Sequence, residues 1–260
     1  MPIVTLTTDL GTSNFYLASI KAKLLQAGLN IDVIDVTHEI SPHSIAEAAF
    51  VFSNVFSAFP KNTIHILGVD AGSVDNSRHL GIQYKNQYLL TADNGFFSLI
   101  ADQQPDLVVE LMIDSQTDVL TFPTKDVYVP AALHLARGGT LEVIGRRTTE
   151  LRRMLNLAPT YDRDSIKGKI IYIDHYGNAI SNIRIENFKA LHGGRPFVIR
   201  LRHRGYEITE ISKRYSDVIE SERLALFNSA GYLEIAINRG NASSLMGLSQ
   251  DDPIVIEFER

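Results

Sequence analysis

The first half of the chain alternates between short apolar runs and longer amphipathic stretches. The apolar runs predict buried strands at residues 3–6, 31–36 and 63–69. Apolar side chains at helical spacing predict helices at residues 14–27 and 44–59. Further along, the pattern predicts a hairpin at 80–92, a short helix at 96–101, a strand at 107–112 and a helix at 127–136. This alternation is typical of an α/β domain with a mostly parallel central sheet.

The pattern changes near residue 150. A polar, charged stretch comes first, and short strands separated by Gly, Asn and Asp turns follow it. These strands are predicted at residues 169–173, 196–201, 206–211, 223–227, 231–237 and 253–258. Short strands without helical periodicity favour a smaller all-β, barrel-like domain. We therefore predict an α/β N-terminal domain at 1–150, a linker at 151–166 and a β-barrel C-terminal domain at 167–260.

Composition and charge narrow the function classes. The 260 residues carry a net charge of −5 and no block of Lys or Arg, so we expect no nucleic-acid partner. The absence of cysteine excludes disulfides, thiolate metal sites and a cysteine nucleophile. Met1 and Pro2 lead directly into a strand, and no apolar run approaches the length of a bilayer span. We expect a cytoplasmic protein with no membrane partner.

Polar side chains gather where the predicted strands of the first half end. The clusters are Thr7–Asp9, Thr37–Glu39 with His43, Asp70–Asp75 and Asp93–Gly95. Each cluster alone could be a turn or a helix cap, and Asp93 and Asn14 are candidate caps. The carboxyl ends of parallel strands are, however, the place where α/β sheets bind ligands. Four clusters at one edge therefore predict a ligand site there.

Several common motifs are missing from these strand ends. No Gly-x-Gly-x-x-Gly follows the first strand, and no phosphate-binding loop is present. His38 and His43 are five residues apart with Pro42 between them, so they cannot share one helical face. We therefore predict no metal site.

A second candidate site lies at residues 172–183. An apolar strand ends in Asp174, and Tyr176, Gly177 and Asn178 follow within four residues. A carboxylate and a carboxamide beside an aromatic ring suit a small ligand that carries both a charge and a flat ring. The alternative is a polar turn with Gly177 in a left-handed conformation and Asn178 capping it. The residues alone leave both interpretations open.

Taken together, these motifs resemble a known family. The motifs of the first half are Thr8–Gly11 with Tyr16, Asp35–His38 with Pro42, Val69-Asp70, Asp93–Gly95 and Asp126–Pro130. They resemble the N-terminal domain of the S-adenosylmethionine hydrolase and halogenase superfamily. That superfamily includes the hydroxide adenosyltransferases, the fluorinase and the chlorinase. Ile173–Ala179, Asn228–Ala236 and Gly240–Ala242 are similar to its C-terminal signatures. The motifs occur in order over almost the whole chain.

The resemblance implies a homotrimer with sites between subunits, S-adenosylmethionine as the substrate, adenosine as the product and no cofactor. It implies that Asp9 binds the ribose hydroxyls and that His43 packs against the sugar. Asp174 would pair with the methionine ammonium and Ser229 with its carboxylate. The adenine would be held by Tyr176, Asn178, Asn241 and Ala242.

The implied reaction is displacement of methionine by water at the ribose 5′ carbon. The leaving group is neutral, so the enzyme mainly positions and desolvates the nucleophile.

This chain differs from the family pattern at the residues that would act in that step. Asp70 is in place, but Arg78 comes one residue late, with Ser77 at the family position. Pro123 replaces a histidine, and Thr124 stands where hydrolases have glycine and the fluorinase has serine.

Three functions follow from these departures. In a hydrolase, Asp70 would hold water together with Arg78 or His79 and with Thr124. Alternatively, the chain binds S-adenosylmethionine or adenosine with weak or no turnover. A halogenase is favoured only by Thr124, and Asp70 argues against it because a carboxylate raises the energy of a nearby halide. Arg78 could instead be a surface residue paired with Asp75.

Overall fold

The computed structural model divides into two compact units, residues 1–155 and 156–260. It describes residues 1–72, 78–113, 121–155, 158–203 and 205–259. Asp75, the predicted surface partner of Arg78, and Ser77 lie outside these residues. None of the helices in the described part of the chain is long and apolar enough to cross a membrane.

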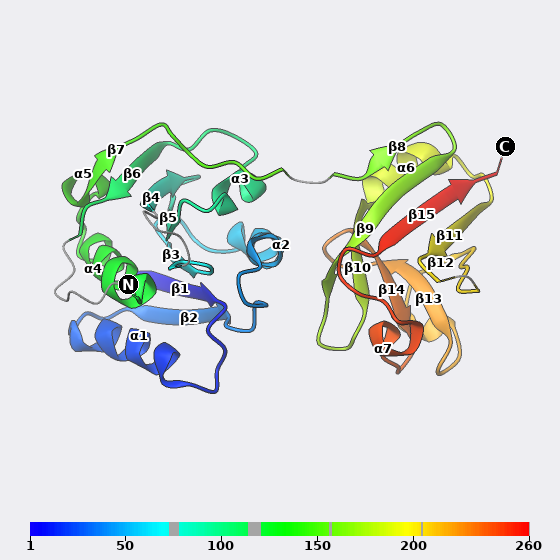
Figure 1. Cartoon of the computed structure of the whole chain (residues 1–260), viewed down its shortest axis with the longest axis horizontal. Coiled ribbons are helices and arrows are strands. Elements are labelled where there is room, and N and C mark those ends of the chain that lie inside the picture. The colour runs from blue at the N-terminus through cyan, green and yellow to red at the C-terminus, as the bar shows by residue number, and fades with distance from the viewer. Residues whose placement is uncertain (73–77, 114–120, 156–157, 204, 260) are drawn as a thin grey trace. The chain divides into compact units, whose positions relative to one another are not determined.

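The first unit is built on a mixed sheet with the strand order β2-β1-β3-β5-β4-β6-β7 (Figure 1). Its strands are β1 (Ile3–Thr8), β2 (Asp32–Thr37), β3 (Ile64–Gly68), β4 (His79–Tyr84), β5 (Gln87–Ala92), β6 (Leu107–Leu111) and β7 (Gly145–Arg147). The strands β2, β1, β3 and β5 pair in parallel, and β4, β6 and β7 add antiparallel partners at one side. The predicted α/β fold with parallel central strands is confirmed.

Helices cover both faces of this sheet. They are α1 (Phe15–Gln26), α2 (Ile45–Phe56), α3 (Phe96–Ile100), a π-helical turn (Thr124–Tyr128), α4 (Val129–Ala136) and α5 (Leu141–Ile144). Successive strand residues point to opposite faces. Leu90 of β5 packs in one core with Ile20 of α1 and Ala132 of α4, whereas Leu89 packs in another with Phe52 of α2. The strand ends that carry the polar clusters are thus held between two packed layers.

The second unit is a strand-rich, barrel-like sheet ordered β11-β15-β9-β10-β14-β13-β12, with β8 beside β9. Its strands are β8 (Thr160–Tyr161), β9 (Ser165–Ile173), β10 (Ala179–Arg184), β11 (Phe197–Leu201), β12 (Ile211–Ser212), β13 (Arg223–Phe227), β14 (Tyr232–Ile237) and β15 (Pro253–Phe258). The helices are α6 (Ile185–His192), a 3-10 turn (Tyr215–Asp217) and α7 (Ala242–Met246). Strand β9 pairs with β15 along its first part and with β10 along its last part. A large apolar core fills the unit, and Leu224, Leu226 and Ala236 form a separate, smaller cluster.

Some predicted boundaries in the second unit were wrong. The strand predicted at 206–211 forms only an isolated bridge between Ile208 and Ile199, followed by the short β12. Its apolar positions are too few, because charged and polar residues separate them. Strand β8 and the start of β9 lie inside the predicted linker, where Asp162 accepts hydrogen bonds from Asp164 and Ser165 and closes a turn.

Candidate functional site

Three residues from different loops meet at the carboxyl edge of the first sheet. Asp9 follows β1 and Asp70 follows β3, and these strands are parallel neighbours in register at Thr8 and Gly68. The Oδ2 atom of Asp9 accepts hydrogen bonds from the backbone N–H of His43 at 3.0 Å and of Asp70 at 3.2 Å. One carboxylate oxygen therefore fixes two loops. We call Asp9, His43 and Asp70 the strand-end cluster.

The side chains of His43 and Asp70 contact each other within this cluster. His43 Nδ1 lies 2.8 Å from Asp70 Oδ1. Both residues have left-handed backbone conformations, with φ of 65° and 48°. Such conformations are uncommon outside glycine and are maintained only where the surroundings enforce them. The His43 side chain is nevertheless 72% exposed, so the ring is fixed on one side and open on the other.

Thr124 borders the strand that leads to this cluster. The residue begins the π-helical turn and is only 2% exposed. Its side chain covers Gly68, where an added Cβ would lie 2.6 Å from the Thr124 Oγ1 and Cγ2 atoms. Pro123 lies beside the loop after Asp70, because its Cδ is 3.7 Å from the position that a Cβ on Gly72 would take. The structure thus brings Thr124 next to the end of β3, and its role beside the nucleophile stays a prediction.

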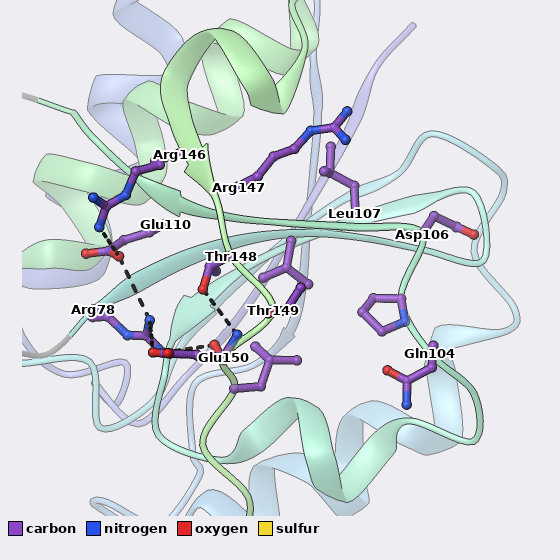
Figure 2. A pocket seen from close by; sticks show the side chains of 13 residues that line it. Arg78, Gln104, Asp106, Leu107, Glu110, Arg146, Arg147, Thr148, Thr149 and Glu150 are labelled. Atoms are coloured by element: carbon purple, nitrogen blue, oxygen red, sulfur yellow. Dashed lines mark hydrogen bonds and ion pairs between the residues drawn. The ribbon is translucent and has the colours of Figure 1, made fainter.

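Arg78 has other partners. Its guanidinium binds Asp93 and the backbone oxygen of Glu150, and it lies within 3.9 Å of the Glu110 and Glu150 carboxylates. The hydrogen bond with Asp93 raises the pKa of Arg78. Arg78, Glu110 and Glu150 line a cavity of about 600 Å³ together with Arg146 (Figure 2). The contacts of Arg78 thus join carboxylates outside the strand-end cluster, and its catalytic role stays a prediction.

The Asp93-Asn94 pair also has structural contacts. Asp93 accepts a hydrogen bond from the backbone N–H of Arg152 at 2.8 Å, which ties the end of the first unit to its sheet. The prediction that Asp93 caps a helix was wrong, because Asn94 accepts the hydrogen bond from Phe96 at the start of α3. The Asn94 amide also donates to the carbonyl of Val69 at 3.1 Å and so braces the residue before Asp70. The predicted cap at Asn14 is confirmed, since its side chain accepts from the backbone N–H of Tyr16.

The second candidate site is a compact turn after β9. Asp174 Oδ1 accepts from the backbone N–H groups of Tyr176 at 2.9 Å and Asn178 at 2.8 Å. Its Oδ2 accepts from the Asn178 amide at 3.1 Å, and Gly177 has a φ of 81°. The turn interpretation is therefore confirmed for the backbone. Asn178 is buried within the turn, whereas the Tyr176 side chain is 76% exposed.

This turn packs against the start of α7. A Cβ added to Gly177 would lie 2.2 Å from Cγ of Asn241, and Ser243 donates a hydrogen bond to the Gly177 carbonyl. Asn241 itself caps α7, since its side chain accepts from the backbone N–H of Ser244 at 2.7 Å. Ala242 is buried next to it. The residues predicted to contact adenine are thus gathered on neighbouring segments of the second unit.

The predicted residue Ser229 is exposed in the loop before β14. Near it, the sequence analysis missed a buried pair, Glu234 and Tyr215. The amide of Asn228, the residue before Ser229, donates to Glu234 at 3.1 Å. Glu234 is buried and also accepts from the Tyr215 hydroxyl at 2.7 Å. Burial, this hydrogen bond and the negative charges of Glu234 and Asp174 raise the pKa of Tyr215. A glutamate in the middle of an otherwise apolar strand was the signal that could have found this pair.

Metal ligation finds no support in the part of the chain that the structure describes, where no group of three or more His, Asp or Glu is arranged to hold an ion.

One histidine of the first unit, His65, lies in the core. It is fully buried between Thr5 and Gln87. Burial lowers its pKa from the ordinary value of 6.5 to about 4. Its position in the core separates it from the strand-end cluster.

Comparison with known proteins relates the whole chain to one family. Residues 4–145 match the S-adenosylmethionine (SAM) hydroxide adenosyltransferase N-terminal domain, and residues 168–255 match the C-terminal domain of the same family. A relative from Methanocaldococcus jannaschii named (R)-S-adenosyl-L-methionine hydrolase is 28% identical over 267 residues, which covers 99% of this chain and 97% of the relative. A fluorinase from Actinopolyspora mzabensis is 23% identical over 274 residues, or 91% of each chain.

Solved structures agree with this relationship. An uncharacterized conserved protein from Thermotoga maritima superposes with a TM-score of 0.87 at 28% identity, over 98% of this chain and 99% of its own. A conserved hypothetical protein from Thermus thermophilus superposes with a TM-score of 0.76 at 26% identity, over the whole of both chains. The two matched domains, their order and the shared fold lead to one conclusion: this chain belongs to the SAM hydroxide adenosyltransferase family.

Proposed function

We propose that the protein hydrolyses SAM: water displaces methionine at the ribose 5′ carbon, giving adenosine and L-methionine. The observation that carries this proposal is the strand-end cluster, where the Asp70 carboxylate is hydrogen-bonded to an exposed imidazole at the ligand-binding edge of the sheet. The names of the full-length relatives support the same reaction and suggest the (R) configuration at sulfur for the substrate.

The first unit would bind the ribose and the nucleophile. Asp9 uses Oδ2 for two backbone N–H groups, and no hydrogen bond to its Oδ1 is found among the described residues. This oxygen suits a ribose hydroxyl, because a carboxylate accepts hydrogen bonds and donates none. Asp70 and the hydroxyl of Thr124 would help to hold the attacking water. Arg78 is the least supported of the catalytic predictions, because carboxylates already surround its guanidinium.

The second unit would bind the amino acid and the base. Asp174 would pair with the methionine ammonium and Ser229 with its carboxylate. The exposed ring of Tyr176 offers a flat apolar face to adenine, and Asn241 and Ala242 lie on the segment that packs against the neighbouring Gly177. Asn178 would act by orienting Asp174, since its amide already donates to that carboxylate. A homotrimer, with sites between subunits, and a cytoplasmic location are also proposed on the family resemblance.

The reaction needs little acid catalysis. The sulfonium departs as a neutral thioether, so positive charge moves from sulfur to the attacking oxygen during the step. Groups that orient water in line with the C–S bond and accept its proton therefore stabilise the transition state. Carboxylates near this point also attract the cationic substrate.

The test is incubation of the purified full-length protein with each sulfonium epimer of SAM in ¹⁸O-labelled water, followed by chromatography and mass spectrometry. We expect methionine and adenosine with the label at the 5′ oxygen, formed faster from the (R) epimer. Parallel reactions contain chloride or fluoride. A 5′-halogenated nucleoside would instead identify a halogenase, and calorimetric binding of SAM without any product over hours would identify a binding protein.

A further inference from the structure

We propose that His43 is the general base that takes the proton from the attacking water, with Asp70 as the residue that orients its ring. The inference rests on the proposed hydrolysis. It replaces the sugar-packing role that the family resemblance implies for His43.

The hydrogen bond between the two side chains determines which ring nitrogen is available. A carboxylate has no hydrogen to donate, so His43 Nδ1 must donate to Asp70 Oδ1 across the 2.8 Å contact. A neutral imidazole with its hydrogen on Nδ1 keeps the lone pair on Nε2. No hydrogen bond to Nε2 is found among the described residues, and the side chain is 72% exposed. The basic nitrogen is therefore left to accept a proton from water.

The backbone holds this pair in position. His43 and Asp70 both have φ in the left-handed region, and each donates its backbone N–H to the same oxygen of Asp9. A left-handed backbone is unfavourable for such residues, so it persists where several contacts fix it. Pre-organised side chains are what proton transfer requires, because the base must be within hydrogen-bond reach of the water.

Other candidates for the base are less suitable. His79 is bound through Nδ1 to the buried Tyr128 hydroxyl at 2.9 Å, and burial lowers its pKa. His38 is buried and hydrogen-bonded to Thr8. Pro123, beside the Asp70 loop, has no group that can accept a proton. Among the histidines near this sheet edge in the described chain, His43 alone combines an orienting carboxylate with an exposed second nitrogen.

The step conserves atoms and charge. The water oxygen forms a bond to the ribose 5′ carbon while the C–S bond breaks, and the electron pair of that bond leaves with sulfur. The water proton passes to Nε2 of His43, and the imidazolium then releases it to solvent. Among the described residues, the charged groups in contact with His43 are Asp70 at its ring and Asp9 at its backbone N–H, and both stabilise the transient imidazolium.

The first test is His43→Gln. Glutamine can still donate to Asp70 but cannot take up a proton, so we expect kcat to fall by about 10²–10⁴-fold. The dissociation constant of adenosine, measured by calorimetry, should change by less than about threefold. We expect the wild-type kcat to fall as the pH is lowered, because a protonated base cannot take up the proton of water, and this acidic limb should be absent from the variant. The control is His134→Gln, because the His134 ring donates to the Thr140 carbonyl away from the cluster and its loss should leave kcat unchanged.

The second test is His43→Ala with added imidazole. The exposed position leaves room for free imidazole, which should restore part of the rate in proportion to its unprotonated fraction. Circular dichroism checks folding of each variant. The proposal is overturned if His43→Gln keeps the wild-type kcat and acidic limb, if only adenosine affinity is lost, if imidazole restores nothing, or if both variants unfold. A wild type that forms no adenosine would instead refute the proposed hydrolysis itself.

Discussion

The two candidate sites use the same residue types in opposite ways. In the turn after β9, Asp174 directs both carboxylate oxygens to groups within four residues of itself. In the strand-end cluster, the contacts of Asp9 and Asp70 join loops that are 27 to 61 residues apart. The turn is therefore a local structure that would form around its own backbone, whereas the cluster depends on the packing of the whole sheet.

This difference suggests a division of work between the two regions. A carboxylate with its hydrogen bonds satisfied locally is rigid and suits recognition of a fixed charge such as an ammonium. A carboxylate that orients an exposed imidazole has proton-transfer capacity, and that suits chemistry. The following predictions are ordered by expected effect, and each one tests whether the cluster and the turn differ in this way.

The largest effect is expected for Asp70→Asn. Loss of the orienting carboxylate should lower kcat by about 10²–10⁴-fold, while adenosine affinity changes by less than about threefold. Steady-state kinetics and calorimetry provide the two measurements. Asp102→Asn is the control, because Asp102 is exposed and pairs with Lys85 on the surface of the same unit. Equal losses of rate and affinity would make Asp70 a binding residue and remove the contrast with Asp174.

Acid should weaken the first unit through His65. Its pKa is about 4 in the folded state and near 6.5 when unfolded, so the unfolded chain binds the proton more tightly. Stability is therefore full above pH 6.5 and falls by about 3 kcal/mol as the pH drops toward 4. His65 bonds to Thr5 on β1, so hydrogen exchange should show β1 and β3 losing protection before β9 and β10.

The matched variant His65→Gln cannot titrate and should show a flatter pH dependence of first-unit protection, whatever its stability at neutral pH. The same steep dependence in wild type and variant would show that another group causes the acid response.

The packing of the turn on α7 can be tested by comparing two glycines that have nearly the same φ. Gly177 and Gly194 have φ of 81° and 80°, but an added Cβ meets Asn241 only at Gly177, and nothing lies within 4 Å at Gly194. Both alanine variants should lose about 1 kcal/mol of unfolding free energy because of the left-handed backbone. Gly177→Ala should lose about 1–3 kcal/mol more, because Asn241 must move. Urea denaturation measures both, and equal losses would mean that the packing of the turn on α7 contributes little.

The smallest effect on catalysis is expected for Arg78→Gln. If Arg78 anchors Asp93, Glu110 and Glu150, the variant should lose about 1 kcal/mol of stability and retain kcat within about threefold. Thermal unfolding and steady-state kinetics measure the two quantities. A loss of kcat as large as that of Asp70→Asn would restore the catalytic role predicted for Arg78 from the sequence.

The strand ends were predictable because buried parallel strands are continuous apolar runs, and the chain marks their ends with Asp9 and Asp70. The contact between His43 and Asp70 was not predictable, because it depends on left-handed backbone conformations at both residues. Strand β10 was missed since Ser181 and Asn182 interrupt its apolar pattern. The structure explains this interruption, because Asn182 accepts a hydrogen bond from the backbone of Lys169 on β9.

Contacts between polar side chains that are far apart in the sequence were also not predictable. Arg78 lies in a polar loop, where a lone arginine is expected to pair locally or face solvent. Its observed partners include Glu150, 72 residues further along the chain, and nothing in local spacing indicates that contact. The same holds for Tyr215 and Glu234, which meet across 19 residues inside the second unit.

The shared oxygen of Asp9 has a consequence for how this protein can change in evolution. Two backbone N–H groups depend on one acceptor atom, so losing that atom disturbs two loops together. Position 9 should therefore tolerate few replacements even in variants selected for binding alone, whereas position 43, with its exposed side chain, can vary with an effect mainly on rate. Directed evolution toward a different nucleophile has most freedom if it randomises position 43 and leaves the aspartate that supports its loop unchanged.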